Sequence, residues 1–101
     1  MHNGDGFSLH VQCRGLLTYL WLELPEPVTD TPQLLLDGIP TKAHWFIQHS
    51  GQRLESGRGL PAINRLKQWQ QHHTLTLIGQ PPLSLHPLAT ALIPIRRRCH
   101  W

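Results

Sequence analysis

The chain has 101 residues, of which 40% are hydrophobic and 15% are charged, and its formal net charge at pH 7 is +3. This composition excludes a disordered chain and indicates one small globular domain, although nine prolines and eight glycines predict many turns. Because no run of roughly 18 apolar residues occurs, we expect neither a membrane-spanning helix nor a membrane partner. The opening residues Met1–Gly6 lack the basic and apolar regions of a signal peptide, so none is expected.

Acidic and basic residues are distributed unevenly along the chain. Before Gly38 there are five acids and one base, Arg14, which gives a formal charge of −4. From Gly38 onward there are eight bases and one acid, Glu55, which gives +7. A basic region of this kind indicates an acidic partner, and nucleic acid is the commonest one.

The two cysteines, Cys13 and Cys99, are too few and too far apart to indicate a disulfide scaffold or a redox pair. They favour free thiols in a reducing, cytoplasmic setting. Pairing stays open as an alternative, because a terminal strand beside the first strand would bring the two cysteines together.

The first two predicted elements are strands. Apolar and polar residues alternate from Phe7 to Arg14, which predicts a half-buried strand. Residues 16–24 predict a second strand, with leucines on one face and Tyr19 and Trp21 on the other. Since both of its faces are apolar, we expect this strand to be central or buried on two sides.

Shorter elements follow. Gln33–Leu36 is an apolar run stopped by Asp37-Gly38, a pair that is typical of tight hairpin turns. Residues 43–49 alternate and predict a strand. Residues 53–59 predict a mobile basic loop, because two closely spaced glycines are costly inside an element.

One helix is predicted, over residues 61–72, because Pro61 suits a first helical turn and apolar residues recur at three- to four-residue spacing. Residues 74–78 and 90–95 predict the last two strands, the second at a sheet edge because it contains Pro94.

These elements predict a mainly-β, small α+β fold, most simply a five-stranded barrel with one helix before the penultimate strand. We expect a single globular domain over residues 1–95 and a basic C-terminal tail over residues 96–101.

The order of three strands, one helix and two strands is that of the OB-fold. Over residues 42–95 the chain resembles the single-stranded-DNA-binding proteins and their primosomal relatives. The matching segments are a tryptophan-bearing strand (42–47), a helix (61–71), a strand ending in glycine (74–79) and a final strand (91–95). The resemblance implies an OB-like barrel that binds single strands. The chain departs from that family in its short, proline-rich last link and in lacking an acidic C-terminal tail.

Basic residues with interleaved aromatic residues form the candidate site. Aromatic rings on strands stack on unpaired bases, while Arg and Lys neutralise phosphates. The candidate nucleic-acid-binding residues are Lys42, His44, Trp45, Phe46, Arg53, Arg58, Arg65, Lys67, Arg96, Arg97 and Arg98. Two alternatives stay open. Trp45 would fill the core, leaving Phe46 and His44 as the exposed rings, and Arg96–Arg98 would be a disordered solubilising tail.

The sequence gives little support for metal binding or for catalysis. Eight histidines and two cysteines are many, but no pair has a recognised zinc spacing, so we expect no metal and no cofactor. Cys13 alternates with apolar residues and is expected in the core, which leaves no evident nucleophile. We therefore expect a protein that is not an enzyme.

The sequence thus predicts a small cytoplasmic nucleic-acid-binding module that favours single strands over duplexes. The alternative is a protein-interaction or accessory subunit of a larger complex, or a homo-oligomer, in which the two oppositely charged halves make the contacts.

Overall fold

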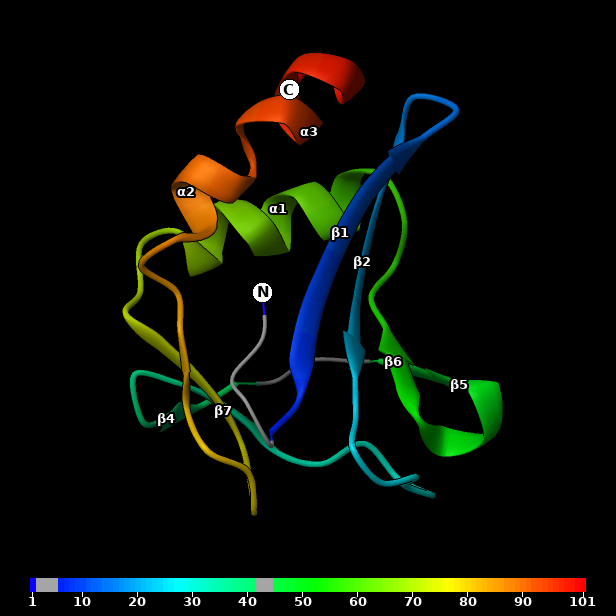
Figure 1. The fold of residues 1–101 in the computed structure, drawn as a ribbon, viewed down its shortest axis with the longest axis vertical. Coiled ribbons are helices and arrows are strands. Elements are labelled where there is room, and N and C mark those ends of the chain that lie inside the picture. The colour runs from blue at the N-terminus through cyan, green and yellow to red at the C-terminus, as the bar shows by residue number, and fades with distance from the viewer. Residues whose placement is uncertain (2–5, 42–44) are drawn as a thin grey trace.

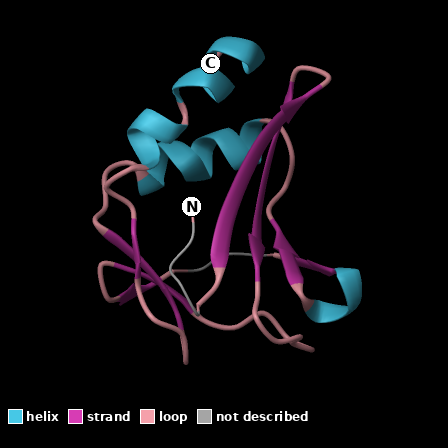
Figure 2. Ribbon diagram, viewed as in Figure 1, coloured by secondary structure: helices cyan, strands magenta, loops and turns pink. Residues whose placement is uncertain are grey.

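The computed structural model describes residues 1, 6–41 and 45–101. In this part of the chain eight short strands form two antiparallel sheets of four strands each, joined by three α-helices and one short 3-10 turn (Figure 1, Figure 2). The helices lie together on one side of the long β1–β2 hairpin (Figure 1). The fold is therefore small, mainly β and of the α+β type.

The first sheet has the strand order β1-β2-β6-β5. Its strands are β1 (Ser8–Arg14), β2 (Leu17–Glu23), β6 (Arg53–Glu55) and β5 (Phe46–Gln48). The two long strands confirm the predictions for residues 7–14 and 16–24 to within one residue at each end. Part of the predicted strand over 43–49 lies outside the described residues, and the rest contains β5.

The mobile loop predicted over residues 53–59 is wrong in its first half. Residues 53–55 form β6, which pairs with β2 on one side and with β5 on the other. Leu54 is fully buried in this central position. The free energy gained by burying it stabilises the strand, although ordering the nearby glycines, which begin at Gly57, costs conformational entropy.

The second sheet has the order β4-β3-β7-β8. Its strands are β4 (Ile39–Pro40), β3 (Leu34–Leu36), β7 (Thr74–Leu77) and β8 (Leu83–Ser84). Asp37 and Gly38 join β3 to β4 with φ angles of 51° and 80°, the left-handed backbone that a two-residue hairpin turn requires. The predicted hairpin is confirmed.

Within the described residues these strands form two separate sheets and not one closed barrel, so the five-stranded OB-like barrel is not confirmed. A continuous apolar core instead lies between the elements, with buried residues from both sheets and from the helices.

The predicted helix is α1 (Leu60–Trp69), which has a proline in its first turn and buries Ala62, Leu66 and Trp69. It precedes β7, the penultimate strand, as expected. The 3-10 turn η1 (His49–Gly51) connects β5 to β6.

The strand predicted over residues 90–95 is wrong, because this part of the chain is helical. It forms α2 (Leu88–Ala91) and α3 (Ile93–Cys99), so Arg96, Arg97 and Arg98 lie in a helix. Pro94 falls in the first turn of α3, where its missing N–H costs no hydrogen bond.

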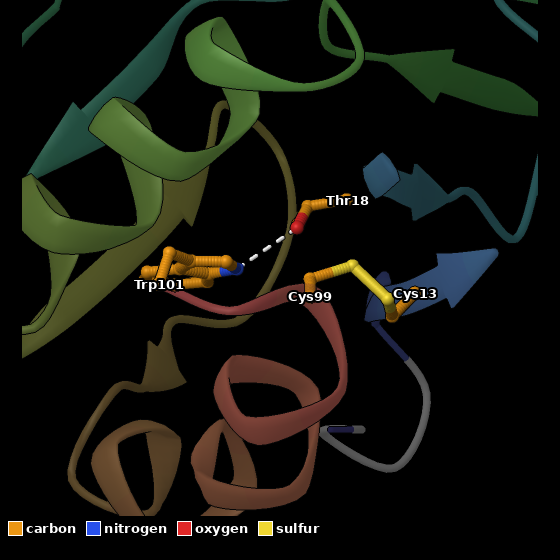
Figure 3. Close-up of a disulfide and its surroundings, with 4 residues drawn as sticks. All are labelled: Cys13, Thr18, Cys99 and Trp101. Carbon is orange, nitrogen blue, oxygen red and sulfur yellow. Dashed lines mark hydrogen bonds between the residues drawn. A yellow bond between two sulfur atoms is a disulfide. The ribbon is translucent and has the colours of Figure 1, made fainter. Parts of the chain in front are cut away.

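The C-terminal helix is fastened to the first sheet by two contacts (Figure 3). Cys99 forms a disulfide with Cys13 of β1, and the indole Nε1 of Trp101 donates a hydrogen bond to Thr18 Oγ1 at 2.9 Å. The expectation of free thiols is therefore wrong. The alternative that the two cysteines pair is confirmed, but a helix and not a terminal strand brings Cys99 to Cys13.

Asp37 also connects its hairpin turn to the chain that follows α1. Its carboxylate accepts hydrogen bonds from the backbone N–H groups of Thr74 and His73, at 2.9 and 2.8 Å, and lies 2.9 Å from His72 Nδ1. These bonds, led by that from Thr74, lower the pKa of Asp37 from 3.8 to about 2.

We expect Asp37→Asn to reduce the sensitivity of the fold to acid. Because the pKa of Asp37 is lower in the folded than in the unfolded chain, the carboxylate stabilises the fold above pH 3.8 and loses this effect as the pH falls toward 2. Urea midpoints measured between pH 2 and pH 6 test this, and superimposable pH profiles for the two proteins would contradict it.

None of the helices in the described ranges has both the length and the apolar character needed to cross a membrane.

Candidate functional site

The candidate site is the face of the first sheet that points away from the core. Side chains alternate along β2, so that Leu20 and Leu22 are buried while Tyr19, Trp21 and Glu23 point to the opposite side and are only half-buried. We call this opposite side the outer face. It carries His10, Arg14, Tyr19, Trp21, Glu23, Phe46, Arg53 and Glu55.

Strand register sets four of these residues in one row across the sheet. His10 lies opposite Trp21, Trp21 opposite Glu55, and Glu55 opposite Phe46. The rings of His10 and Trp21 stack with their centroids 5.3 Å apart and 7° between their planes. Phe46 ends the row at the edge strand and is 52% exposed.

Arg53 is the centre of an ion-pair network on the outer face. Its guanidinium lies over the Trp21 ring, 4.8 Å from the centroid, and contacts Glu23 at 3.2 Å and Glu55 at 3.6 Å. Trp21 Nε1 also donates a hydrogen bond to Glu23 at 3.2 Å, and this bond is the main cause that lowers the pKa of Glu23. Arg53 therefore has both an aromatic and an acidic partner within the chain.

Two further arginines lie over the aromatic ring of Tyr19. The guanidinium carbons of Arg14 and Arg58 lie 5.0 and 5.7 Å from the centroid of its ring. The described residues provide no ion pair for either arginine. This part of the outer face is thus positively charged.

The structure places the sequence-predicted site residues in several separate groups. Lys42 and His44 lie outside the described residues. Trp45 is 3% exposed and stacks on Trp69, with a centroid distance of 6.0 Å, while Arg65 covers its ring at 4.5 Å. Trp45 therefore fills the core, as the alternative interpretation expected.

The other predicted residues are divided between the sheet and the helices. Phe46, Arg53 and Arg58 lie on or beside the outer face. Lys67 of α1 and Arg96 of α3 instead meet at the ring of Trp101, 6.0 and 5.4 Å from its centroid. Most of the bases are thus held by aromatic rings of the chain itself.

Arg14, Tyr19 and Trp21 are not among the site residues predicted from the sequence. The alternation in residues 16–24 did place Tyr19 and Trp21 opposite the leucines. It suggested burial on two sides, whereas arginine and histidine side chains cover these rings.

No group of three or more histidines, cysteines and acids in the described part of the chain could hold a metal ion. A cavity of about 270 Å³ lies between α1 and the β3–β4 hairpin, away from the outer face. Arg65 lines it, and burial lowers the pKa of this arginine.

Fold and site together define a small two-sheet α+β domain with an open sheet face of aromatic, basic and acidic side chains. The family model described as "Type VI secretion system VasI, EvfG, VC_A0118" matches residues 6–101, and the chain belongs to this family. No significant match is found among curated proteins or among solved structures.

Family membership corrects the main functional prediction. The chain belongs to a type VI secretion family and not to the single-stranded-DNA-binding proteins or their primosomal relatives. The matched segments were generic strands and a helix, which many small α+β folds share. The nucleic-acid-binding module is therefore wrong, and the alternative of a protein-interaction or accessory subunit is the better supported one.

Proposed function

We propose that this protein is a non-enzymatic accessory subunit of a type VI secretion system and acts by binding another protein of that system. The proposal rests on the family to which the chain belongs and on the outer face of the first sheet. Trp21, Tyr19 and Phe46 lie on this face together with arginines, and these are residue types enriched where proteins meet.

The half-exposed rings are the observation that carries the proposal. Phe46 is 52% exposed at the end of the row that runs from His10 through Trp21 and Glu55, so a partner that covers the row would bury its ring. Such a contact uses the outer face, in place of the two oppositely charged halves that the sequence suggested. Within the chain, Arg53 of the basic second part already forms an ion pair with Glu23 of the acidic first part.

The disulfide supports an oxidising compartment. Disulfides persist outside the reducing cytosol and are rare within it. The Cys13–Cys99 bond therefore favours a location where cysteines are oxidised over the cytoplasm that free thiols suggested.

Deleting the gene is expected to reduce release of type VI substrates from a secreting bacterium, and Phe46→Ser is expected to reproduce part of that loss. An aromatic ring that is well buried by the partner contributes about 2 kcal/mol or more to binding, or roughly 30-fold in affinity. Ile78→Ser is the matched control, because Ile78 is 58% exposed and follows β7 of the other sheet. Normal secretion in the deletion strain would exclude the proposed role.

A further inference from the structure

A small cavity opens on the outer face beside Tyr19. Its volume is about 90 Å³, and it is lined in part by Arg14, Tyr19, Arg53, Ser56 and Arg58. We call it the Tyr19 cavity. The acid in its lining is Glu55, which is already engaged by Arg53 at 3.6 Å. The cavity therefore has an excess of positive charge.

Arg53 shows what an arginine on this face binds. Its guanidinium lies over the Trp21 ring while its nitrogens contact the carboxylates of Glu23 and Glu55. Arg14 and Arg58 lie over Tyr19 in the same way, but the described residues offer them no carboxylate. Arginines over an aromatic ring thus occur at Tyr19 as they do at Trp21, but those at Tyr19 have no ion pair with an acid of the described residues.

Ser56 provides a second, independent indication of a missing ligand. It is 8% exposed, and its hydroxyl has no hydrogen-bond partner among the described residues. Buried hydroxyls are nearly always satisfied in native proteins. Ser56 lines the same cavity as the two arginines, so an unsatisfied hydroxyl group lies beside them.

We propose that the Tyr19 cavity binds the carboxylate of an acidic side chain from the protein partner. Arg14 and Arg58 supply the charge, and the Ser56 hydroxyl donates to a carboxylate oxygen. The cavity has about three times the ~30 Å³ that one water occupies in the liquid, so a carboxylate group has room in it. This inference rests on the proposed function, because it specifies the chemistry of the contact made by the outer face.

A titration of the oxidised protein with a peptide of eight glutamates tests the proposal. The backbone amide NMR signals of Arg14, Ser56 and Arg58, and the guanidinium signals of the two arginines, are expected to shift together as the peptide is added. Arg14→Ala and Arg58→Ala should each weaken binding roughly tenfold, the usual effect of losing a charged hydrogen bond. Ser56→Ala should weaken it about fivefold.

The control variant is Arg97→Ala, which removes the same charge from the exposed surface of α3 and should leave binding unchanged. Equal weakening by Arg97→Ala would show diffuse attraction and overturn the proposal, as would a titration without signal changes at Ser56. Inorganic phosphate is titrated in parallel, and phosphate binding as tight as that of the peptide would overturn the assignment to a carboxylate.

The secretion assay keeps this inference separate from the proposed function. Loss of secretion on deletion together with no peptide binding would reject the Tyr19 cavity and leave the accessory role standing. Peptide binding together with normal secretion in the deletion strain would retain the cavity and reject that role.

Discussion

Breaking the disulfide between Cys13 and Cys99 is expected to lower the free energy of unfolding by about 2–5 kcal/mol. The two cysteines are 86 residues apart, so the bond removes a large share of the freedom of the unfolded chain. It also holds α3 against β1, and α3 carries Trp101 to its hydrogen bond with Thr18 (Figure 3). Urea denaturation with and without reductant measures the effect.

The double variant Cys13→Ser, Cys99→Ser is the control for this prediction. Its stability should equal that of the reduced wild type and should not respond to reductant. Identical urea midpoints for the oxidised and reduced wild type would contradict the expected stabilisation. Alkylation of thiols in intact cells tests the proposed compartment, since cysteines that are labelled without prior reduction would place the protein in a reducing one.

Trp45→Ala is expected to lower the free energy of unfolding by about 3–5 kcal/mol. Trp45 is 3% exposed, stacks on Trp69 and is covered by the guanidinium of Arg65, so its removal leaves a large cavity. Its indole N–H has no hydrogen-bond partner in the described part of the chain, so the loss comes from packing.

The neighbouring variant Phe46→Ala provides the matched control for Trp45. Phe46 is one residue away and 52% exposed, and its replacement should cost less than about 1 kcal/mol. Thermal or urea unfolding of the two variants tests the difference. Comparable small losses would show that Trp45 is not a core residue.

The long strands could be predicted because each buries one face. Along β1 and β2 the buried side chains recur at every second position, and this pattern is readable without any tertiary information. The Asp37-Gly38 turn was predictable for a similar reason, since these residue types tolerate the positive φ that a tight hairpin needs.

The C-terminal helices could not be assigned by the same reasoning, although a signal was present. Leu88, Leu92, Ile95 and Cys99 recur at helical spacing, and three of them are buried. The branched residues around Pro94 favoured an edge strand instead. Whether a proline ends an element or begins a helix depends on what the following turn packs against, and here that is β1.

The candidate site was only partly predictable. The excess of bases after Gly38 suggested nucleic acid as the partner, which the family contradicts, and sequence order does not show which bases share a surface. Arg14 and Arg58 come from distant parts of the chain and meet at Tyr19 only because β2 pairs with β1 on one side and β6 on the other. Ser56 had no sequence signal, because an unsatisfied hydroxyl is visible only once its surroundings are packed.

The disulfide also turns most of the chain into a closed covalent ring. Only residues 1–12 and 100–101 lie outside the segment that Cys13 and Cys99 bound. A protease that cuts once in any loop of this ring opens it without separating the two pieces. The nicked protein therefore keeps both sheets tethered to each other, and the cut becomes visible on a gel only after reduction.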